Sequence, residues 1–464
     1  MSSAPTSPRY EFTIHTYGCK VNTYDTGLLQ KRLESQGHVS VEMRKIAPAL
    51  DAFGLGSRIP RVHILNTCAV TGEATREAAK QVRRLKAKDP FSTVVVTGCG
   101  AQVDGETFDT LAGADLIVAN SHKGMLERLL DEHFKGELKE KVFRSNIFRK
   151  DDLEAGGGIE SGHTRSFLKI QDGCNSFCTY CVIPFARGKS RSIPAGELIL
   201  RIRELRTQGA GEIVLTGVHI GDYEEKRGSS KTLLLHDLVA EVLEKTDVPR
   251  IRLSSLEPVE LTPELLKLYS QTDRLCPHFH MSIQSANTRV LGAMKRKYTA
   301  QDVEWSLNAI RENVPGSFVG MDVIVGFPGE TEEEFADTYQ RLEQTPWTRI
   351  HVFPYSERPG TKAANFENSV PREERAFRSQ RLRELSLARF EAEAQAQVGT
   401  RKRALILKAP GKGAEGLSRD YWPVKLEDGA GAWAGQEVDV EVTGYEGSSA
   451  NRTEGVLRGR LWKV

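Results

Sequence analysis

Hydrophobic positions in the first third of the chain come in short runs rather than long stretches. Four β-rich runs alternate with segments whose apolar residues recur at helical spacing, including Tyr24–Gln36 and Glu73–Lys88. The runs are Glu11–Thr16, Arg61–Asn66, Ser92–Thr97 and Asp115–Ala119. Strands that alternate with helices are typical of a parallel α/β domain. The pattern predicts such a domain over residues 10–135, followed by a linker over 136–162 that carries Gly156, Gly157 and Gly158.

A second alternating series fills the middle of the chain. Its predicted strands are Ser166–Gln171, Glu212–Thr216, Arg250–Ser254, His278–Ile283, Val319–Val325 and Arg349–Pro354. The helices expected between them include Ala195–Gln208, Thr232–Glu244 and Thr331–Glu343, and Thr331 with Glu334 makes a capping box. Six β/α units predict a partial barrel over residues 163–397, with a charged helix from Arg372 to about Gln397. On such a scaffold, function lies in loops at the C-terminal ends of the strands.

The remaining residues, 398–464, change character. Short β-like runs at Arg403–Lys408, Glu437–Thr443 and Gly455–Trp462 are accompanied by turns containing Gly411, Gly413 and Gly416. This pattern predicts a small β-barrel. The expected fold is therefore α/β, with an N-terminal parallel α/β domain, a central partial (β/α)6 barrel and a C-terminal small β-barrel.

The composition is that of an ordinary globular protein, with 39% hydrophobic and 27% charged residues in 464. The net charge of +2 neither supports nor excludes a nucleic-acid partner, because basic residues can gather locally. Residues Met1–Arg9 lack the apolar run of a secretory signal, and no stretch is long and apolar enough to cross a bilayer. We therefore expect a cytoplasmic protein without a membrane partner. Seven cysteines in a reducing compartment indicate metal or redox chemistry rather than disulfides.

Three of these cysteines fall in one loop directly after the first predicted barrel strand. Cys174, Cys178 and Cys181 are separated by three and two residues, and no fourth cysteine lies nearby. Soft thiolates select iron–sulfur clusters or zinc. Three thiolates on a four-iron cluster leave one iron without a protein ligand, and that iron can chelate a substrate. A structural zinc knuckle is the alternative, but such sites usually pair two CxxC motifs and this chain has no second one.

Three further cysteines, Cys19, Cys68 and Cys99, each follow a predicted strand of the first domain by a few residues. In a parallel sheet these positions share one edge, where ligands bind, so thiols distant in sequence are expected to converge. Glycines before Cys19 and Cys99 allow sharp turns and leave room for a cluster. The alternative is three buried cysteines that act as small apolar residues. Cys276 has no such context, and we assign it to packing.

The CxxxCxxC loop after a first barrel strand resembles the signature of the radical S-adenosylmethionine superfamily. In that superfamily the open iron binds S-adenosylmethionine, and an electron from the cluster cleaves the cofactor to a 5′-deoxyadenosyl radical. The resemblance implies that Tyr180 lies against the adenine. It also implies that the turn Val323–Glu330, with Gly326 and Glu330, lies near S-adenosylmethionine. A tight strand-to-helix turn alone would also explain Gly326 and Gly329.

From residue 11 to the C-terminus the chain is similar to the methylthiotransferase family. The similarity rests on Gly18–Asn22, on Asn66–Val70, on the Gly98–Cys99 pair, on the CxxxCxxC loop and on the small barrel. It implies two 4Fe-4S clusters together with S-adenosylmethionine. Cys19, Cys68 and Cys99 would hold an auxiliary cluster that carries the sulfur, while Cys174, Cys178 and Cys181 would hold the radical cluster. Such an enzyme is a transferase of sulfur-containing groups.

Within that family the stretches Glu212–Ile220 and Ser254–Pro258 resemble the branch that acts on N6-threonylcarbamoyladenosine at position 37 of tRNA. The branches for isopentenyladenosine and for a ribosomal-protein aspartate are the alternatives. Ala286, in Ile283–Asn287, departs from the family's usual glycine, which bears on substrate fit. A zinc-stabilised, non-catalytic RNA-binding protein and a radical enzyme with one cluster are the alternatives of other classes.

The resemblance implies the anticodon stem-loop of tRNA as a partner and a reduced flavodoxin- or ferredoxin-like protein as electron donor, and it implies no DNA. Basic residues that could contact phosphates form four local groups, although charge runs are more often solvated faces. They are Arg76, Lys80, Arg83, Arg84, Lys86 and Lys88; Arg187, Lys189 and Arg191; Lys295, Arg296 and Lys297; and Arg401, Lys402, Arg403, Arg458 and Arg460. Deletion of Val398–Val464 is expected to weaken tRNA binding and to leave both clusters assembled.

Overall fold

The computed structural model describes residues 9–41, 59–150, 164–228, 231–408, 414–427, 433–447 and 455–462. The chain folds into two compact units. The first comprises residues 1–160, 172–191 and 356–361, and the second comprises 161–171, 192–355 and 362–464. The cysteine loop therefore belongs to the same unit as the N-terminal domain. The domain boundaries drawn from the sequence stay a prediction.

The first unit contains a parallel sheet of order β2-β1-β3-β4-β5-β6. Its strands are β1 (Glu11–Thr16), β2 (Val39–Ser40), β3 (Arg61–Thr67), β4 (Thr93–Gly98), β5 (Leu116–Ala119) and β6 (Val142–Phe143). Its helices are α1 (Lys20–Ser35), α2 (Gly72–Lys88), α3 (Cys99–Val103), α4 (Gly105–Phe108), α5 (Leu126–Phe134) and α6 (Ile183–Arg187), with short 3-10 turns η2 (Lys123–Met125) and η3 (Ile147–Arg149). The predicted parallel α/β domain is confirmed.

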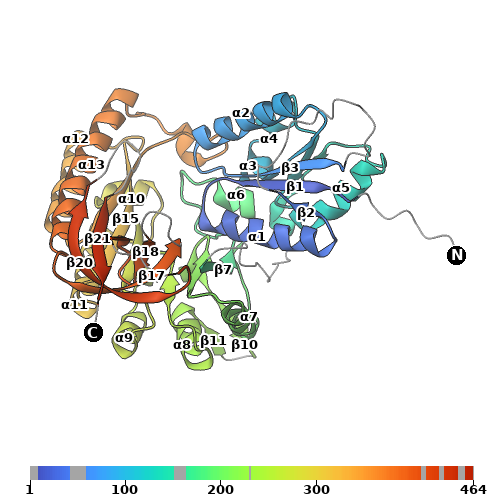
Figure 1. Ribbon diagram of the computed structural model, residues 1–464. Helices are drawn as coiled ribbons and strands as arrows, with labels where there is room; N and C mark the ends of the chain where they lie inside the picture. The colour runs from blue at the N-terminus through green and yellow to red at the C-terminus, as the bar shows by residue number, and fades with distance from the viewer. Residues whose placement is uncertain are drawn as a thin grey trace. The chain divides into compact units, whose positions relative to one another are not determined.

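Both faces of this sheet are covered, as the near-continuous apolar runs of β3 and β4 require. Leu29 and Leu33 of α1 pack with α5 on one face, and Val82 and Leu85 of α2 pack with α3 and α4 on the other. Figure 1 shows α1 and α2 on opposite sides of the sheet. Part of the predicted linker is ordered, because β6 joins the sheet and η3 follows it, whereas residues 151–162 of that linker lie outside the described residues.

The second unit contains the predicted partial barrel. Its sheets have the orders β12-β9-β7-β8 and β13-β14-β15-β16. The strands are β7 (Arg165–Asp172), β8 (Arg191–Ser192), β9 (Glu212–Gly217), β12 (Ile251–Leu253), β13 (Ser255–Leu256), β14 (His278–Gln284), β15 (Phe318–Val325) and β16 (Arg349–Pro354). Only Ser254 separates β12, which pairs with β9, from β13, which pairs with β14. The two sheets therefore follow one another along a single curved array.

Helices separate these strands. They are α7 (Ala195–Thr207), α8 (Leu235–Lys245), α9 (Pro263–Gln271), α10 (Thr288–Ala293), α11 (Ala300–Asn313), α12 (Glu332–Gln344) and α13 (Arg372–Gln395), with 3-10 turns η4 (Ile220–Asp222), η5 (Pro258–Glu260) and η6 (Lys362–Asn365). The capping box of Thr331 and Glu334 is confirmed at the start of α12. The prediction of a helix from Thr232 is wrong at its start. A hairpin of β10 (Glu225–Arg227) and β11 (Lys231–Leu233) takes Thr232, and the Asp237 carboxylate caps the helix at Leu234.

The predicted small β-barrel is confirmed as a closed barrel of five strands, ordered β17-β18-β19-β21-β20. These are β17 (Arg401–Lys408), β18 (Glu415–Ser418), β19 (Pro423–Leu426), β20 (Glu437–Glu446) and β21 (Val456–Leu461). Gly416 lies inside β18 rather than in a turn, and a Cβ there would meet Leu405 O at 2.9 Å. Gly411 and Gly413 lie outside the described residues.

A buried charge cluster joins the small barrel to the partial barrel within the second unit. Glu212 accepts from Arg165 Nε at 2.7 Å, from Arg250 Nε at 2.9 Å and from Arg252 Nη2 at 2.9 Å. Arg250 also donates to Glu437 of β20 at 2.8 Å and to Leu417 O at 3.0 Å. Phe318 and Phe390 of the partial barrel share a core with Trp422 of the small barrel. The small barrel is therefore packed against the rest of its unit.

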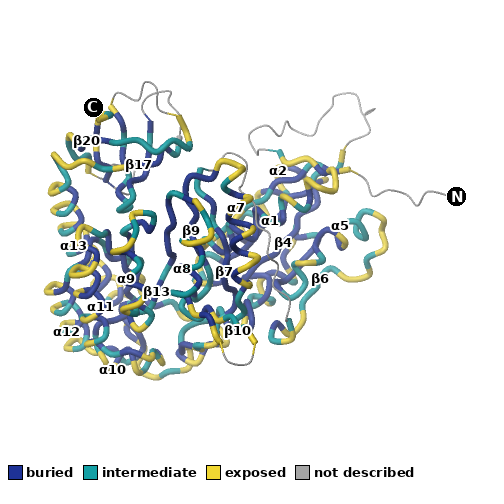
Figure 2. The backbone as a smooth tube through the Cα atoms, turned by 90° about the horizontal axis from the view of Figure 1, so that it is seen from below, coloured by how far each residue is buried: buried dark blue, intermediate teal, exposed yellow. Residues whose placement is uncertain are grey.

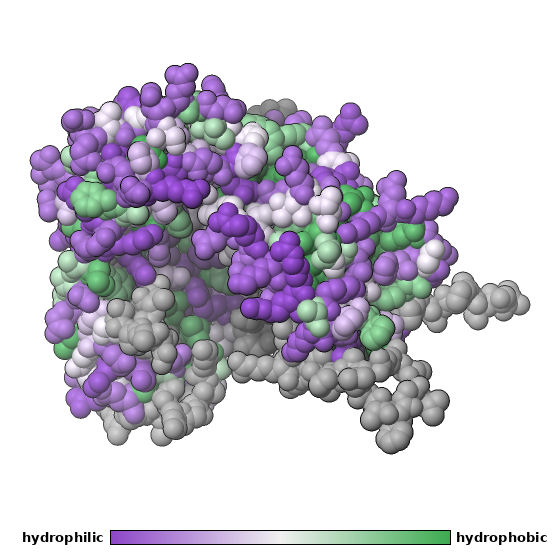
Figure 3. All heavy atoms as spheres, turned by 90° about the horizontal axis from the view of Figure 1, so that it is seen from above, coloured by the Kyte–Doolittle hydropathy of each residue, from purple (hydrophilic) through white to green (hydrophobic). Residues whose placement is uncertain are grey.

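Burial follows this architecture. The strands β4 and β9 are dark blue along most of their length in Figure 2, while α7, α9 and α13 carry exposed positions on their outer turns. The face in Figure 3 is largely hydrophilic, with hydrophobic residues in small scattered patches. No helix in the described residues is long and apolar enough to cross a membrane.

Candidate active site: two cysteine triads

The structure places Cys19, Cys68 and Cys99 at the C-terminal ends of three neighbouring strands. Cys19 is the N-cap of α1 after β1, Cys68 follows β3 directly, and Cys99 opens α3 after β4. The parallel register pairs Thr16 with Asn66 and Thr67 with Gly98, so the three strands end at the same edge. The observed geometry thus matches the convergence expected from the sequence.

Two glycines let the three loops approach one another closely. Gly18 has φ +96°, and a Cβ there would lie 2.6 Å from Cys68 Sγ. Gly98 has φ +93°, and a Cβ there would lie 2.5 Å from Thr67 O. Only glycine satisfies both the left-handed backbone and this lack of space. These glycines hold the turn before Cys19 against Cys68 and the turn before Cys99 against the end of β3.

The pKa values of Cys68 and Cys99 reflect their burial in this edge of the sheet. Burial raises the pKa of Cys68 to about 11, with smaller contributions from the Cys99 and Cys19 thiolates. Burial likewise raises the pKa of the Cys99 thiol. Asn120 Nδ2 donates to Cys99 Sγ at 3.5 Å, and the Val70 amide donates to Cys68 Sγ at 3.5 Å. The Cys68 and Cys99 thiols are therefore protonated at neutral pH without a metal, and metal binding at this edge would release protons.

The second triad lies in the loop between β7 and α6, as the sequence predicts. Cys174 and Cys181 are half-buried, and Cys178 is buried. The amide of Cys174 donates to Gly188 O at 3.1 Å, and the amide of Cys181 donates to Cys178 O at 3.0 Å. Gly173, at φ +77°, has no room for a Cβ, which would lie 1.9 Å from Lys189 O. The loop is thus held at both ends by hydrogen bonds, while Cys174 and Cys181 stay partly accessible.

The donor sets of both triads fit iron–sulfur clusters. Each offers three soft thiol ligands from backbone that glycines and hydrogen bonds hold in place. The first triad gathers its thiols from three strand ends, and the second carries them on one short loop. Six of the seven cysteines are accounted for in this way. Cys276 lies apart in the second unit, buried 4.0 Å from the Glu212 carboxylate, in agreement with a packing role.

A polar network joins α1, the end of β7 and α6, and the sequence analysis did not predict it. Arg187, grouped there with Lys189 and Arg191 as a phosphate contact, is instead buried, and this interpretation is wrong. Its guanidinium donates to Asp172, Asn22 and Asp25 within the first unit. Lys123 Nζ also donates to Asp25 at 3.1 Å. No sequence signal marks the contacts of Asn22 and Asp25 with Arg187, because these residues are 165 and 162 positions away along the chain.

The other predicted cofactor contacts have the following surroundings. Tyr180 is half-buried in the cysteine loop. Gly326, at φ +70°, follows β15, and its amide donates to Glu330 Oε2 at 2.6 Å. That oxygen also accepts from Arg378 Nη1 at 2.8 Å, and the Glu330 side chain is 1% exposed. Within the chain, Glu330 stabilises the turn after β15, and its role toward S-adenosylmethionine stays a prediction.

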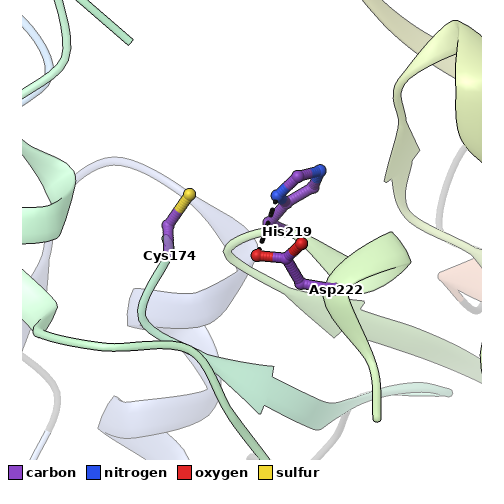
Figure 4. Close-up of side chains that lie close together, drawn as sticks. All are labelled: Cys174, His219 and Asp222. Atoms are coloured by element: carbon purple, nitrogen blue, oxygen red, sulfur yellow. Dashed lines mark ion pairs between the residues drawn. The ribbon is translucent and has the colours of Figure 1, made fainter. Parts of the chain in front are cut away.

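A titratable cluster lies at the C-terminal ends of β9 and β13 in the second unit. His219 Nδ1 is 3.2 Å from Asp222 Oδ2, an ion pair drawn in Figure 4. Its Nε2 is 3.4 Å from Glu257 Oε1 and also contacts Glu260. Burial raises the pKa of Glu257, although Arg296 lies 2.6 Å away. The two stretches with the branch resemblance, around His219 and Glu257, therefore touch each other, a contact that sequence reasoning did not anticipate.

The remaining basic groups differ in exposure. On α2, the side chains of Arg76, Lys80, Arg83, Arg84 and Lys88 are exposed, whereas Lys86 pairs with Asp115. Arg296 is 6% exposed and paired with Glu257, so its interpretation as a phosphate contact is wrong. On the small barrel, Arg401 and Arg460 are at least half exposed and form surface pairs with Asp439 and Glu441. Trp462 is 41% exposed beside Arg401, whose guanidinium lies 5.3 Å from the ring centroid.

Comparison with protein families and solved structures defines the class. Residues 168–342 match the radical SAM superfamily, and residues 11–119 match a family described as uncharacterized protein family UPF0004. The fold resembles a radical S-adenosylmethionine methyltransferase, TsrM, from Kitasatospora setae with a TM-score of 0.58. The identity is 15%, and the match covers 77% of each chain, so it concerns the fold alone. The protein is thus a radical S-adenosylmethionine enzyme.

Curated relatives define the family more closely. The chain is 36% identical to threonylcarbamoyladenosine tRNA methylthiotransferase MtaB of Aquifex aeolicus, over 85% of this chain and 92% of the relative. The identity to MtaB of Bacillus subtilis is also 36%, over 80% of this chain and 79% of the relative. A tRNA-2-methylthio-N(6)-dimethylallyladenosine synthase of Thermobifida fusca is 31% identical over 93% of this chain and 86% of the relative. The chain belongs to the methylthiotransferase family, whose members use S-adenosylmethionine and carry two 4Fe-4S clusters.

Proposed function

We propose that this protein methylthiolates N6-threonylcarbamoyladenosine next to the anticodon of tRNA, giving the 2-methylthio derivative. The observation that carries the proposal is the 36% identity to two relatives named for this activity, over most of their length. The contact between His219 and Glu257 adds support, because it joins the two stretches that resemble this branch. A tRNA substrate implies a cytoplasmic protein.

In this proposal each cysteine triad holds a different iron–sulfur cluster. Cys174, Cys178 and Cys181 hold the radical cluster, and Cys19, Cys68 and Cys99 hold the auxiliary cluster. When bound, these groups supply the electron that cleaves S-adenosylmethionine and the sulfur that is transferred. The chain contributes three-thiolate ligation at each site, which leaves one iron of each cluster open. The hydrogen bond from the Gly326 amide to the Glu330 carboxylate stabilises the turn proposed to lie near S-adenosylmethionine.

The small barrel is the proposed contact for tRNA. Exposed Arg401, Arg458 and Arg460 lie on the same barrel as Trp462, and arginine beside an accessible aromatic ring suits a nucleic-acid backbone and its bases. Their ion pairs with carboxylates are exposed and contribute little, so phosphates can replace them. The exposed basic row of α2 is a second candidate surface. The electron donor in this scheme is a reduced flavodoxin- or ferredoxin-like protein.

The substrate is tested with anaerobically reconstituted enzyme and two tRNA substrates. One carries N6-threonylcarbamoyladenosine, the other N6-isopentenyladenosine, and mass spectrometry of digested nucleosides reports the product. We expect a mass gain of one methylthio group on the first tRNA only. A product on the second tRNA alone would favour the isopentenyl branch.

That second branch is a specific alternative, because a dimethylallyladenosine synthase matches 93% of this chain. Ala286 lies in the region where the chain departs from the family pattern, directly after the buried Ser285. Changing Ala286→Gly tests whether this position influences the choice of substrate. We expect turnover on the threonylcarbamoyl substrate to be kept and no activity on the other to appear.

A further inference from the structure

A single guanidinium, that of Arg187, connects the surroundings of both cysteine triads within the first unit. Its Nη1 donates to the Asp172 carboxylate at 2.9 and 3.2 Å. Its Nη2 donates to Asn22 Oδ1 at 2.6 Å and to Asp25 Oδ2 at 3.1 Å. The side chain is 3% exposed, so its charge is stabilised by protein groups rather than by water.

The partners of Arg187 belong to the elements that carry the cysteines. Asn22 and Asp25 lie in the first turns of α1, which Cys19 caps. Asp172 ends β7, two residues before Cys174, and Arg187 itself ends α6 after Cys181. One side chain therefore ties the helix of the first triad to the loop of the second. Replacement by a shorter cation would keep the charge and lose part of this set of hydrogen bonds.

Hydrogen bonds also connect the surroundings of Arg187 to the first triad. Asn22, which accepts from Arg187, donates to Thr67 O at 3.1 Å, directly before Cys68. Asn120 donates to Cys99 Sγ at 3.5 Å and to Ala186 O at 2.9 Å, next to Arg187 in the chain. Because Cys19 caps the helix that carries Asn22, all three cysteines are linked to the groups around one buried cation.

We propose that Arg187 is a positioning residue that holds the two triads in register and raises the reduction potential of the auxiliary cluster. The proposal rests on the cluster assignment under the proposed function. Reduction adds an electron to the cluster, so a fixed buried cation in its surroundings stabilises the reduced state. Asp25 shares the charges of Arg187 and Lys123, and therefore opposes this effect.

The test uses the full chain with Cys174→Ala, Cys178→Ala and Cys181→Ala, which retains only the first triad. A potentiometric titration followed by electron paramagnetic resonance gives the potential of the remaining cluster. Arg187→Met is expected to shift the reduction equilibrium at least tenfold toward the oxidised cluster, which is about 59 mV for a one-electron couple. Asp25→Asn is expected to shift it in the opposite direction.

Arg61→Met is the matched control, since it removes one positive charge from the opposite end of the same sheet, where Arg61 pairs with Glu11 and Asp89. It should leave the potential unchanged. Equal potentials in the Arg187→Met, Asp25→Asn and control proteins, or shifts of the same sign for the first two, would overturn the proposal. Should Arg187→Met fail to bind iron, Asp25→Asn and Arg187→Lys decide: the first must raise the potential and the second must stay near the parent. A background protein without a four-iron cluster would contradict the proposed function itself, and the inference with it.

Discussion

At the scale of single residues, Cys68 offers the most direct test of the proposal that the protein holds two clusters. It lies between the strand ends that carry Cys19 and Cys99, and its Sγ faces Gly18. Replacement by alanine removes one of three protein ligands of the auxiliary cluster. We predict that Cys68→Ala lowers the iron content from about eight to about four per chain. The variant should still cleave S-adenosylmethionine and should give no methylthiolated product.

The matched control is Cys276→Ala, which removes a buried thiol next to Glu212 in the second unit. Iron and acid-labile sulfide should stay at the parent level in that protein. Full iron content in Cys68→Ala, or product formation by it, would leave the radical cluster as the single catalytic centre.

Gly18 allows a second prediction at the residue scale. Comparison with Gly37 separates the effect of steric crowding at Cys68 from the effect of a left-handed backbone, which both glycines share. Gly18→Ala places a Cβ 2.6 Å from Cys68 Sγ at φ +96°, whereas Gly37→Ala at φ +88° has nothing within 4 Å. The left-handed backbone alone costs roughly 1 to 3 kcal/mol in both variants. We predict a larger loss of unfolding free energy for Gly18→Ala than for Gly37→Ala in denaturant, and loss of about four irons in Gly18→Ala alone. Equal iron content in both variants would show that the turn at Gly18 can move away from Cys68 without loss of the cluster, and would contradict this prediction.

The cysteines could be located from sequence because strand ends and glycines mark them. Arg187 could not, since its contact with Asp25 spans 162 residues and neither residue has an unusual local context. Basic residues near one another in sequence suggested a phosphate surface, yet burial separated Arg187 and Arg296 from the exposed members of their groups. Whether a charge is solvated depends on tertiary packing, which local patterns do not encode.

Among the structural elements, β7, β9 and β12 meet at the carboxylate of Glu212. Burial alone would raise the pKa of Glu212, but Arg252, Arg165 and Arg250 together hold it well below its ordinary value. Its contribution to stability is therefore present above the ordinary value of 4.5 and is lost as the pH falls through the lowered folded-state value. We predict that Glu212→Gln destabilises the protein by about 3 to 5 kcal/mol near neutral pH, because buried guanidiniums lose their counter-charge.

Urea unfolding monitored from pH 7 downward measures this effect. The parent should lose stability below about pH 4.5 more steeply than Glu212→Gln, since the variant lacks the titrating group. Glu441→Gln is the control, because its partner Arg460 is 59% exposed and such pairs contribute at most about 1 kcal/mol. Parallel pH profiles for parent and Glu212→Gln would contradict this assignment.

The main strands were predictable because short runs of β-branched and aromatic residues leave a clear signal, and β1 and β16 match their predicted limits. The strands β18 and β19 were missed, because each has four residues and they carry Gly416 and Pro423 in place of a continuous apolar run. The hairpin before α8 was missed for a similar reason. Thr232 and Leu233 suit either a helix or a strand, and pairing of β10 with β11 decided between them.

For the molecule as a whole, the small barrel is a better target for point variants than for truncation. Its Trp422 packs against Phe318 and Phe390, so deletion of residues 398–464 would expose apolar surface of the partial barrel. We predict that Arg401→Gln, Arg458→Gln and Arg460→Gln combined weaken tRNA binding and reduce its salt dependence, with the slope falling by about one for each lost phosphate contact.

A triple variant of equal charge, with Arg203→Gln, Lys226→Gln and Lys245→Gln on the exposed surface of the partial barrel, serves as control. Binding measured over a range of salt concentrations compares the two proteins. An equal loss of affinity in both would mean that total charge, and not the small barrel, determines tRNA binding.

The most direct test of the central claim is nucleoside mass spectrometry of tRNA from cells that lack this gene. We predict that 2-methylthio-N6-threonylcarbamoyladenosine disappears while its precursor remains. The parent gene should restore it, and neither Cys68→Ala nor Cys178→Ala should do so. Persistence of that nucleoside in the deletion strain, or loss of the methylthio-isopentenyl nucleoside in its place, would contradict the proposed function.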